Sequence, residues 1–218
     1  NVEFICMTDY PNVNNNTILF PTKIIENTLG KVWAKLKEPQ LRIAETEKYA
    51  HVTYFFNGGE EQPLEFEHRI MIPSPKVLKY ETTPEMSIEP LMAKLCTQLN
   101  NTTFSLLICN FANADMLGHT GNLNAAIQSV EAIDKALGQT AMLCSANNIN
   151  LWITADHGNV ESMWNENNKS AHTAHTSNPV PFIYIGNSNV TLKKTGELSN
   201  IAPTILKLNH LPIPSEMN

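Results

Sequence analysis

Short apolar runs alternate along the chain with longer segments in which apolar residues recur every three or four positions. The short runs predict strands and the periodic segments predict helices, because side chains repeat about every two residues in a strand and about every 3.6 in a helix. Strands are predicted at residues 2–7, 40–44, 68–72, 104–111, 149–154 and 180–185. Helices are predicted at residues 23–37, 47–56, 89–99, 123–144 and 198–208. This alternation is typical of an α/β sandwich with a mostly parallel sheet.

Two of the predicted strands and one helix have the clearest patterns. The sequences FSLLICNF (104–111) and INLWIT (149–154) are almost continuously apolar, so both strands are expected to be buried on both faces. The helix at 123–144 has the most regular apolar spacing, whereas the helix at 198–208 contains Pro203. The polar run at 11–17 predicts a surface loop.

Composition narrows the class of protein. Hydrophobic residues make up 42% and charged residues 17% of the 218 residues, as in soluble globular proteins. No apolar run approaches the roughly 20 residues needed to cross a bilayer, so a membrane protein is excluded. The net charge of −6 argues against nucleic-acid binding. Arg42 and Arg69 are the only arginines, so the chain cannot form an arginine-rich anion site alone.

The cysteines indicate a reducing compartment. Four of them are scattered without a CxxC pair: Cys6, Cys96, Cys109 and Cys144. Such spacing does not predict a disulfide framework, and no signal peptide precedes the first predicted strand. We therefore expect a cytoplasmic protein.

Residues with potential chemistry follow the two most apolar strands. The segment NADMLGHTGN (113–122) comes after residues 104–111, and ADHGN (155–159) comes after residues 149–154. A third segment, HTAHT (172–176), precedes the last predicted strand. Ligands of open α/β sheets bind outside the carboxyl ends of the strands, so a site is expected where these segments meet.

These segments supply carboxylate and imidazole groups. Such a mixed set favours manganese, zinc, cobalt or iron over magnesium or calcium. Two sets a few ångströms apart would form a two-metal site suited to phosphoryl transfer. Each histidine alone could instead be an ordinary surface residue, and the first Asp–His pair, four residues apart, could be a helix-capping pair. The candidate ligands are Asp115, His119, Asp156, His157 and a histidine of the HTAHT segment.

Longer stretches resemble the cofactor-independent phosphoglycerate mutases of the alkaline-phosphatase-like superfamily. They run in the family's order through nearly the whole chain: AETEKYAHVTYFFNGG (44–59), IPSPKV (72–77), PEMS (84–87), NADMLGHTGN (113–122), TADHGN (154–159) and HTAHTSNPVPF (172–182). The resemblance covers the C-terminal part of the family, less than half of a complete enzyme. It implies an alkaline-phosphatase-like three-layer α/β sandwich with a mostly parallel sheet, incomplete in this chain.

The resemblance also implies an activity and its metals. The family interconverts 3-phosphoglycerate and 2-phosphoglycerate in glycolysis, through a phosphoserine and without 2,3-bisphosphoglycerate. Two divalent ions, usually Mn²⁺, are implied. Asp115, His119 and His175 resemble the ligands of one ion, and Asp156 and His157 resemble ligands of the other.

Other residues with potential roles lie close to these ligands in the sequence. Lys48 resembles the lysine that reaches the substrate phosphate beside the nucleophile. Its neighbours Arg42, Glu45 and Glu47 could equally form a salt-bridge network that holds the loop. The other histidine of HTAHT, His172, could orient the loop by a hydrogen bond or be solvated.

Several parts of the family pattern are absent from the chain. These are the metal-binding Asp of the opening strand, the serine nucleophile and the arginines of an inserted domain. Residues 1–19 resemble the end of that inserted phosphotransferase domain and its linker, and residues 20–218 resemble the C-terminal portion of the metal-binding phosphatase-like domain. We therefore expect a fragment without a catalytic residue of its own, inactive alone, whose partner is the missing N-terminal segment of the same protein.

Two other functions remain open from the sequence. A related metallophosphatase or phosphopentomutase would use the same metal ligands, although the ETEKYAHVT block and the HTAHTSNPVP spacing favour the mutase. A non-enzymatic remnant would act as a binding or structural module. The expected ligand is a phosphoglycerate, no nucleic-acid or membrane partner is expected, and the intact enzyme is expected to be monomeric.

Overall fold

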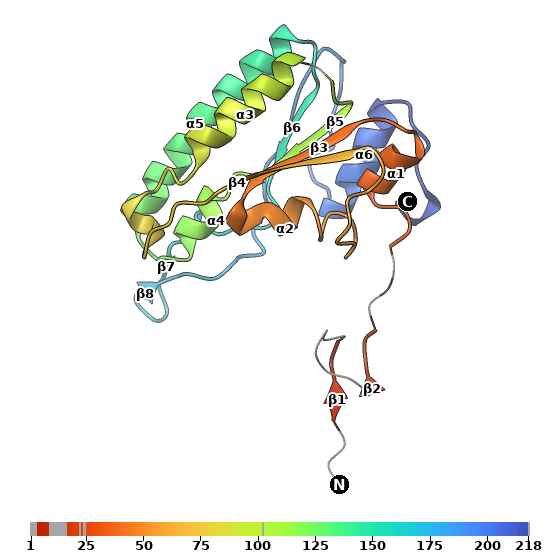
Figure 1. Ribbon diagram of the computed structural model, residues 1–218. Coiled ribbons are helices and arrows are strands. Elements are labelled where there is room, and N and C mark those ends of the chain that lie inside the picture. Colours follow the sequence, from red (N-terminus) through yellow and green to blue (C-terminus); the bar gives the residue numbers. More distant parts are fainter. Residues whose placement is uncertain (1–3, 9–16, 22, 24, 102, 218) are drawn as a thin grey trace.

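The computed structural model describes residues 4–8, 17–21, 23, 25–101 and 103–217. Near the N-terminus, β1 (Ile5–Cys6) pairs in parallel with β2 (Thr17–Ile18), and this pair lies apart from the other elements (Figure 1). The strand predicted at 2–7 is thus present at two positions, while residues 2 and 3 lie outside the described residues. Most of the loop predicted at 11–17 also lies outside them.

Three parallel strands form the central sheet, in the order β4-β3-β5. The middle strand, β3 (Gln40–Glu45), pairs with β4 (Glu67–Ile72) on one side and with β5 (Leu106–Cys109) on the other. All six residues of β3 are buried, as expected for a parallel strand covered on both faces. The sequence predictions of these three strands are confirmed.

A second pair of strands continues the fold. β6 (Leu151–Thr154) pairs with β9 (Phe182–Ile185), and the two run antiparallel. The loop between them contains a short hairpin made of β7 (Trp164–Asn165) and β8 (Ser170–Ala171). The mostly parallel arrangement predicted from the sequence therefore holds for the central sheet, while the last strand reverses direction.

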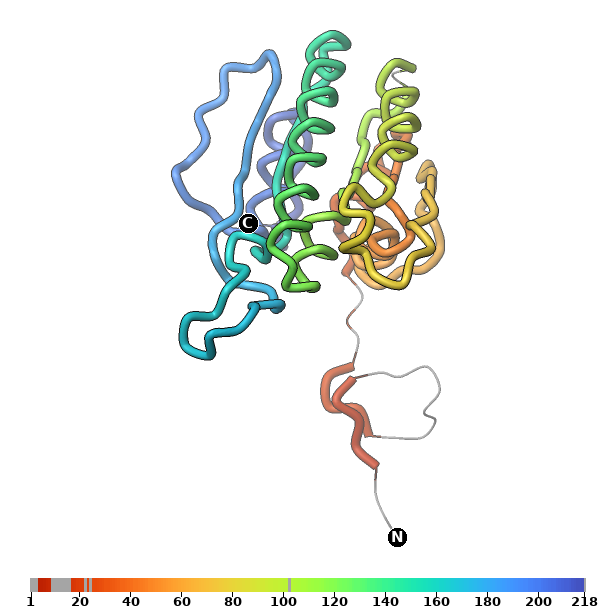
Figure 2. Tube along the Cα trace, turned by 90° about the vertical axis from the view of Figure 1, so that its left-hand side faces the viewer, coloured from red at the N-terminus to blue at the C-terminus, as the bar shows by residue number. Residues whose placement is uncertain are grey.

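Helices cover both faces of the strands (Figures 1 and 2). On one face lie α3 (Ile88–Asn101) and α5 (Leu123–Ala146), and their core takes in Leu107 of β5 and Leu151 of β6. On the other face lie α1 (Leu29–Lys35) and α6 (Ile201–Leu208), and their core takes in residues of the same two strands, Leu106, Ile108 and Trp152. Because β5 and β6 contribute to both cores, they lie in one layer of a three-layer α/β sandwich.

Some helices begin or end at other residues than the sequence pattern predicts. Thr28 is extended and its hydroxyl accepts a hydrogen bond from the backbone N–H of Lys31, so α1 begins at Leu29 instead of residue 23. The helix predicted at 47–56 is a 3-10 turn (Thr46–Lys48) followed by α2 (Tyr49–Val52). Pro203 lies in the first turn of α6, where its missing N–H removes no intrahelical bond.

The strands β5 and β6 are less buried than their apolar sequences predict. Leu106 is the one buried residue of β5, and every residue of β6 is at least partly exposed. Within the described residues, the strand pairs join β5 to β3 and β6 to β9, and none joins β5 to β6. The prediction of complete burial on both faces is therefore wrong for this chain.

In the part of the chain that the structure describes, no helix is both long enough and apolar enough to cross a membrane. The longest, α5, buries small or polar residues such as Ala126, Ser129 and Cys144, whereas Ile127 and Val130 are exposed.

Candidate metal centre

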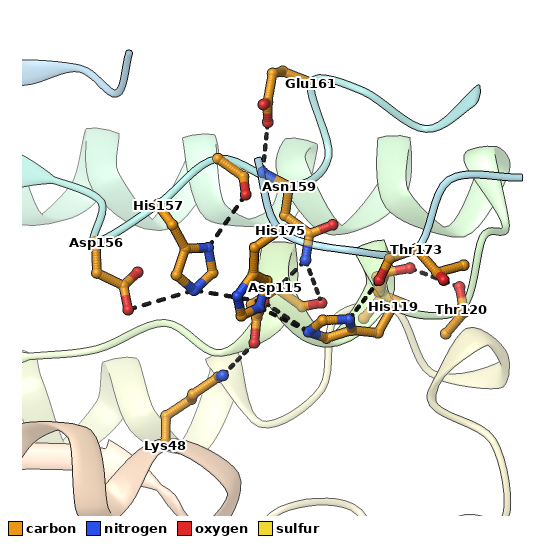
Figure 3. Close-up of polar contacts among 12 residues, drawn as sticks. Lys48, Asp115, His119, Thr120, Asp156, His157, Asn159, Glu161, Thr173 and His175 are labelled. Carbon is orange, nitrogen blue, oxygen red and sulfur yellow. Dashed lines mark hydrogen bonds and ion pairs between the residues drawn. The ribbon is translucent and has the colours of Figure 1, made fainter. Parts of the chain in front are cut away.

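Four segments bring charged and imidazole side chains together at the ends of the strands (Figure 3). The 3-10 turn after β3 carries Lys48. A short helix after β5, α4 (Asn113–Gly118), carries Asp115 and is followed by His119. The loops after β6 and before β9 carry the remaining side chains, Asp156, His157 and His175. All six candidate residues of the sequence analysis therefore lie in one region.

Asp115 lies at the centre of this cluster. Its Oδ1 is 2.9 Å from Nε2 of His175 and 3.1 Å from Nε2 of His119. The same oxygen is 3.9 Å from Nε2 of His157. The Nε2 atoms of His119 and His175 are 3.0 Å apart. One carboxylate oxygen is thus faced by three imidazole nitrogens.

His157 connects Asp115 with the second aspartate of the cluster. Its Nε2 lies 3.5 Å from Oδ2 of Asp156, and its ring stacks on that of His175 with centroids 3.6 Å apart. The side chain of Asp156 is 66% exposed, whereas that of Asp115 is 15% exposed. The two ligand sets considered from the sequence therefore form one continuous cluster, with His157 between the two carboxylates.

The spacing of the donor atoms suits a metal ion. Donor atoms of Asp115, His157 and His175 all lie within 4.8 Å of one another, and His119 adds a third imidazole nitrogen as the fourth donor. With metal–ligand distances of about 2.0–2.2 Å, two ligands of a tetrahedral site lie roughly 3.4 Å apart. Imidazole nitrogens combined with carboxylate oxygen favour a divalent transition metal. The residues present therefore fit a divalent cation.

A backbone carbonyl group fixes the orientation of one imidazole ring. Nδ1 of His119 lies 2.7 Å from the carbonyl oxygen of Thr173, so Nδ1–H donates this bond. In a neutral ring this contact leaves the lone pair on Nε2, the atom that faces Asp115 and that a metal ion would bind. The contact also ties the end of α4 to the loop that carries His175.

Lys48 gives the cluster its positive charge. Its ammonium group donates a hydrogen bond to Oδ2 of Asp115, the oxygen that does not face the histidines, and its side chain is only 12% exposed. Burial alone would raise the pKa of Asp115, but hydrogen bonds from Lys48 and Asn159 outweigh it and lower that pKa to about 2. Asp115 is therefore a carboxylate at neutral pH.

Asn159 belongs to the site although the sequence analysis did not select it. Its Nδ2 donates hydrogen bonds to Oδ1 of Asp115, at 2.9 Å, and to the backbone carbonyl of Asp115, at 3.3 Å. Its amide packs against Gly118, where an added Cβ would overlap it. The sequence signal for this contact is the glycine three residues after Asp115, since glycine permits such close approach.

His172 lies apart from the contacts that join the other histidines. Its Nδ1 is 2.9 Å from the carbonyl oxygen of Ser162, and the backbone N–H of His172 donates to the carbonyl of Met163. His172 therefore connects the two chain segments at the base of the β7–β8 hairpin, whereas His175 faces Asp115.

The three charged neighbours of Lys48 do not form an ion-pair network in the described residues. Glu45 accepts a hydrogen bond from the hydroxyl of Ser74 at 2.9 Å, and burial raises its pKa. Glu47 accepts one from the hydroxyl of Tyr80 at 2.7 Å. Arg42 is fully buried and donates a hydrogen bond to Oε1 of Gln40 at 2.6 Å. Its guanidinium group lies over the ring of Phe56. Burial lowers the pKa of Arg42 to about 10. The salt-bridge interpretation is therefore wrong.

Two comparisons relate the chain to characterised proteins. It is 47% identical over 217 residues to the 2,3-bisphosphoglycerate-independent phosphoglycerate mutase of Shewanella frigidimarina, covering 100% of this chain and 42% of that protein. It is also 47% identical over 221 residues to the protein of the same name from Gracilaria tenuistipitata var. liui, covering 100% of this chain and 43% of that protein. The chain thus spans less than half the length of these relatives.

A solved structure and a family profile agree with these relatives. A crystal structure of Leishmania mexicana phosphoglycerate mutase at low cobalt concentration superposes with a TM-score of 0.86 at 26% identity, covering 98% of this chain and 43% of that one. The profile described as the Metalloenzyme superfamily matches residues 8–213. Because this match extends over nearly the whole sequence, the chain belongs to the Metalloenzyme superfamily.

Proposed function

We propose that this chain is the metal-binding part of a phosphoglycerate mutase that works without 2,3-bisphosphoglycerate and interconverts 3-phosphoglycerate and 2-phosphoglycerate in glycolysis. The observation that carries the proposal is the convergence of Lys48 and three histidines on Asp115. The relatives that match the whole chain, and that bear this enzyme's name, support it.

The proposed cofactor is a pair of divalent ions, with Mn²⁺ as the first choice. Asp115, His119 and His175 would hold one ion, and Asp156 and His157 would supply two ligands to the other. Bound ions of this kind neutralise developing charge on a phosphoryl group and lower the pKa of a coordinated hydroxyl. Asp156 is largely exposed, so further ligands from outside the chain have access to it.

We assign Lys48 to the binding of the substrate's phosphoryl group. Its ammonium lies against Asp115 on the side away from the histidines, where it can exchange this carboxylate for a phosphoryl oxygen without leaving the site. Held in a mostly buried position, the charge would stabilise the equatorial oxygens of the phosphoryl group during transfer.

The remaining parts of the reaction are assigned to segments beyond this chain. The relatives are more than twice its length, and we refer to a polypeptide that contains this chain together with those additional segments as the intact protein. We propose that these segments supply the serine that is phosphorylated, a further metal-binding aspartate and the arginines that bind the glycerate. In this division residues 1–19 end an inserted phosphotransferase domain, and residues 20–218 belong to the phosphatase-like domain. We propose a monomer in the cytoplasm.

The two histidines of residues 172–176 allow a test of the metal site. Manganese stoichiometry and mutase activity would be measured in the intact protein and in its His175→Ala and His172→Ala variants. His175→Ala should lose one ion and nearly all activity, because His175 faces Asp115. His172→Ala, the matched control, should retain both ions, because His172 is bonded to Ser162 instead.

Other outcomes would contradict specific parts of the proposal. Loss of the ion in His172→Ala but not in His175→Ala would reverse the ligand assignment. Release of inorganic phosphate from 3-phosphoglycerate without formation of 2-phosphoglycerate would identify a phosphatase instead of a mutase.

A further inference from the structure

We infer that Glu161 is a positioning residue that sets the distance between the two loops carrying His157 and His175, and so determines the affinity of the metal site. The inference rests on the proposed metal site and deepens it. Glu161 lies outside the candidate ligand set, and its carboxylate accepts three hydrogen bonds that connect the two loops.

The first of these bonds fixes the loop that follows β6. The backbone N–H of Asn159 donates to Oε2 of Glu161 at 2.6 Å (Figure 3). Asn159 lies two residues after His157, and its side chain holds Asp115 at 2.9 Å. Glu161 therefore acts on two of the candidate ligands through one residue.

The other two bonds fix the loop that precedes β9. Oε1 of Glu161 accepts from the hydroxyl of Thr176 and, at 2.9 Å, from Nδ2 of Asn178. Thr176 directly follows His175 in the sequence. The two oxygens of one carboxylate are thus divided between the two loops.

A backbone bridge lies beside this carboxylate. Gly158 and Thr176 exchange two backbone hydrogen bonds, at 2.9 and 3.3 Å. A Cβ on Gly158 would overlap both the hydroxyl of Thr176 and Oε1 of Glu161, so the carboxylate is seated directly on the bridge. The bridge pairs residues adjacent to His157 and His175, whose rings stack at 3.6 Å. Glu161 therefore contacts the Gly158–Thr176 bridge directly, and this bridge sets the separation of the His157 and His175 rings.

The chemistry of the three donors requires a carboxylate. All three partners present hydrogens to Glu161, and an ionised carboxylate accepts through both of its oxygens. A glutamine has one oxygen only, so it cannot accept from the backbone N–H of Asn159 and from the donors of Thr176 and Asn178 at the same time. A Glu161→Gln substitution should therefore release one loop while leaving the size of the side chain unchanged.

The test is a titration of the intact protein with Mn²⁺ by calorimetry. Glu161→Gln should weaken manganese binding by about 10- to 100-fold, the usual cost of losing a group that orients metal ligands. Its kcat at saturating Mn²⁺ should stay close to that of the unmodified protein, because Glu161 is proposed to touch neither substrate nor metal. Glu166→Gln, on the nearby β7–β8 hairpin, is the matched control and should bind Mn²⁺ normally.

A second variant separates positioning from charge. Thr176→Val keeps the shape of the side chain and the charge of Glu161, but it removes the hydroxyl that donates to Glu161 and accepts from the backbone N–H of Asn178 at 3.3 Å. It should weaken Mn²⁺ binding about threefold or more. If Glu161→Gln weakened binding and Thr176→Val did not, the charge of Glu161 alone would explain the effect and the positioning role would be wrong. Unchanged affinity in Glu161→Gln would also overturn it. Failure of the unmodified protein to bind Mn²⁺ would instead reject the metal site itself, and this inference with it.

Discussion

At the scale of single residues, Lys48 pairs with Asp115 and not with the carboxylates that lie beside it in the sequence. The sequence left open a pairing with Glu45 or Glu47, two carboxylates close to it in the chain. Both accept hydrogen bonds from hydroxyl groups, of Ser74 and Tyr80. Lys48 instead reaches across 67 residues of sequence to the centre of the histidine cluster.

Replacement of Lys48 tests this role. In the intact protein, Lys48→Ala should lower kcat at saturating Mn²⁺ by about 10²- to 10³-fold, the usual effect of removing one preorganised donor to a developing charge. Lys48→Arg should not restore the rate, because a planar guanidinium does not occupy the place of a compact ammonium. Steady-state kinetics with 3-phosphoglycerate would measure both.

The control for Lys48 is another lysine with an exposed ion pair. Nζ of Lys79 lies 3.6 Å from Oε1 of Glu81, and the side chain of Lys79 is 73% exposed. Lys79→Ala should therefore leave kcat unchanged. A Lys48→Ala protein with lowered stability but normal turnover per folded molecule would show that Lys48 is structural.

The sequence indicated the six candidate side chains but not the residues that hold them. Aspartate and histidine after apolar strands are recognisable because few residue types bind metals, and the fold brings the ends of parallel strands together. Asn159 and Glu161 act through geometry, and an asparagine or a glutamate in a loop has no distinguishing pattern. Gly118 indicates that some group approaches α4 closely, but only the folded chain shows that this group is Asn159 and that Thr176 donates to Glu161.

At the scale of elements, apolar periodicity located the helices but not their ends or their buried faces. The apolar periodicity before β3 predicts a helix that begins at residue 23. In the structure Thr28 caps α1, and the helix begins at Leu29. In α5 the regular positions Ile127 and Val130 are exposed, while Ser129 between them is fully buried. Burial of a helix face is decided by what packs against it, and that information lies in distant segments of the chain.

Two glycines in helices provide a prediction at this scale. Gly118 ends α4 against the amide of Asn159, whereas Gly138 in α5 has open space around its Cα. Gly118→Ala should destabilise the protein by about 1–3 kcal/mol, because the added methyl group must displace Asn159. Gly138→Ala should stabilise it by about 0.5–1 kcal/mol, since alanine has the higher helix propensity. Urea unfolding of the two variants would measure both changes.

The contrast between the two substitutions separates contact from propensity. Both place the same methyl group in a helix, so stabilisation of the protein by both substitutions would mean that the contact with Asn159 is unimportant. Gly118→Ala should also weaken Mn²⁺ binding, because Asn159 would no longer hold Asp115. Gly138→Ala should leave Mn²⁺ binding unchanged.

At the scale of the whole molecule, the sequence predicted the α/β class and the parallel central strands, but overestimated how completely the strands are buried. Strands with continuous apolar sequences are expected to be covered on both faces of the sheet. The helices do cover both faces, and β3 between its two partners is fully buried. Within the part of the chain that the structure describes, β5 and β6 each pair along one edge only, and apolar side chains such as Ile108 and Ile153 are partly exposed. Their sequences are suited to a more complete sheet than the described residues form.

The last prediction concerns the chain alone, without the additional segments of the intact protein. Purified residues 1–218 supplied with Mn²⁺ should form no measurable 2-phosphoglycerate from 3-phosphoglycerate. A phosphoserine requires a serine hydroxyl beside the metal ligands, and no serine hydroxyl in the described residues hydrogen-bonds any of the six candidate side chains. An enzyme-coupled assay would follow the product, with the intact protein as the positive control and circular dichroism to show that the chain is folded. Appearance of activity when the additional segments are supplied as a second polypeptide would support the division of the site between them. Formation of 2-phosphoglycerate by residues 1–218 alone would mean that the nucleophile lies within this chain, and the assignment of the phosphorylated serine to the additional segments would then be wrong.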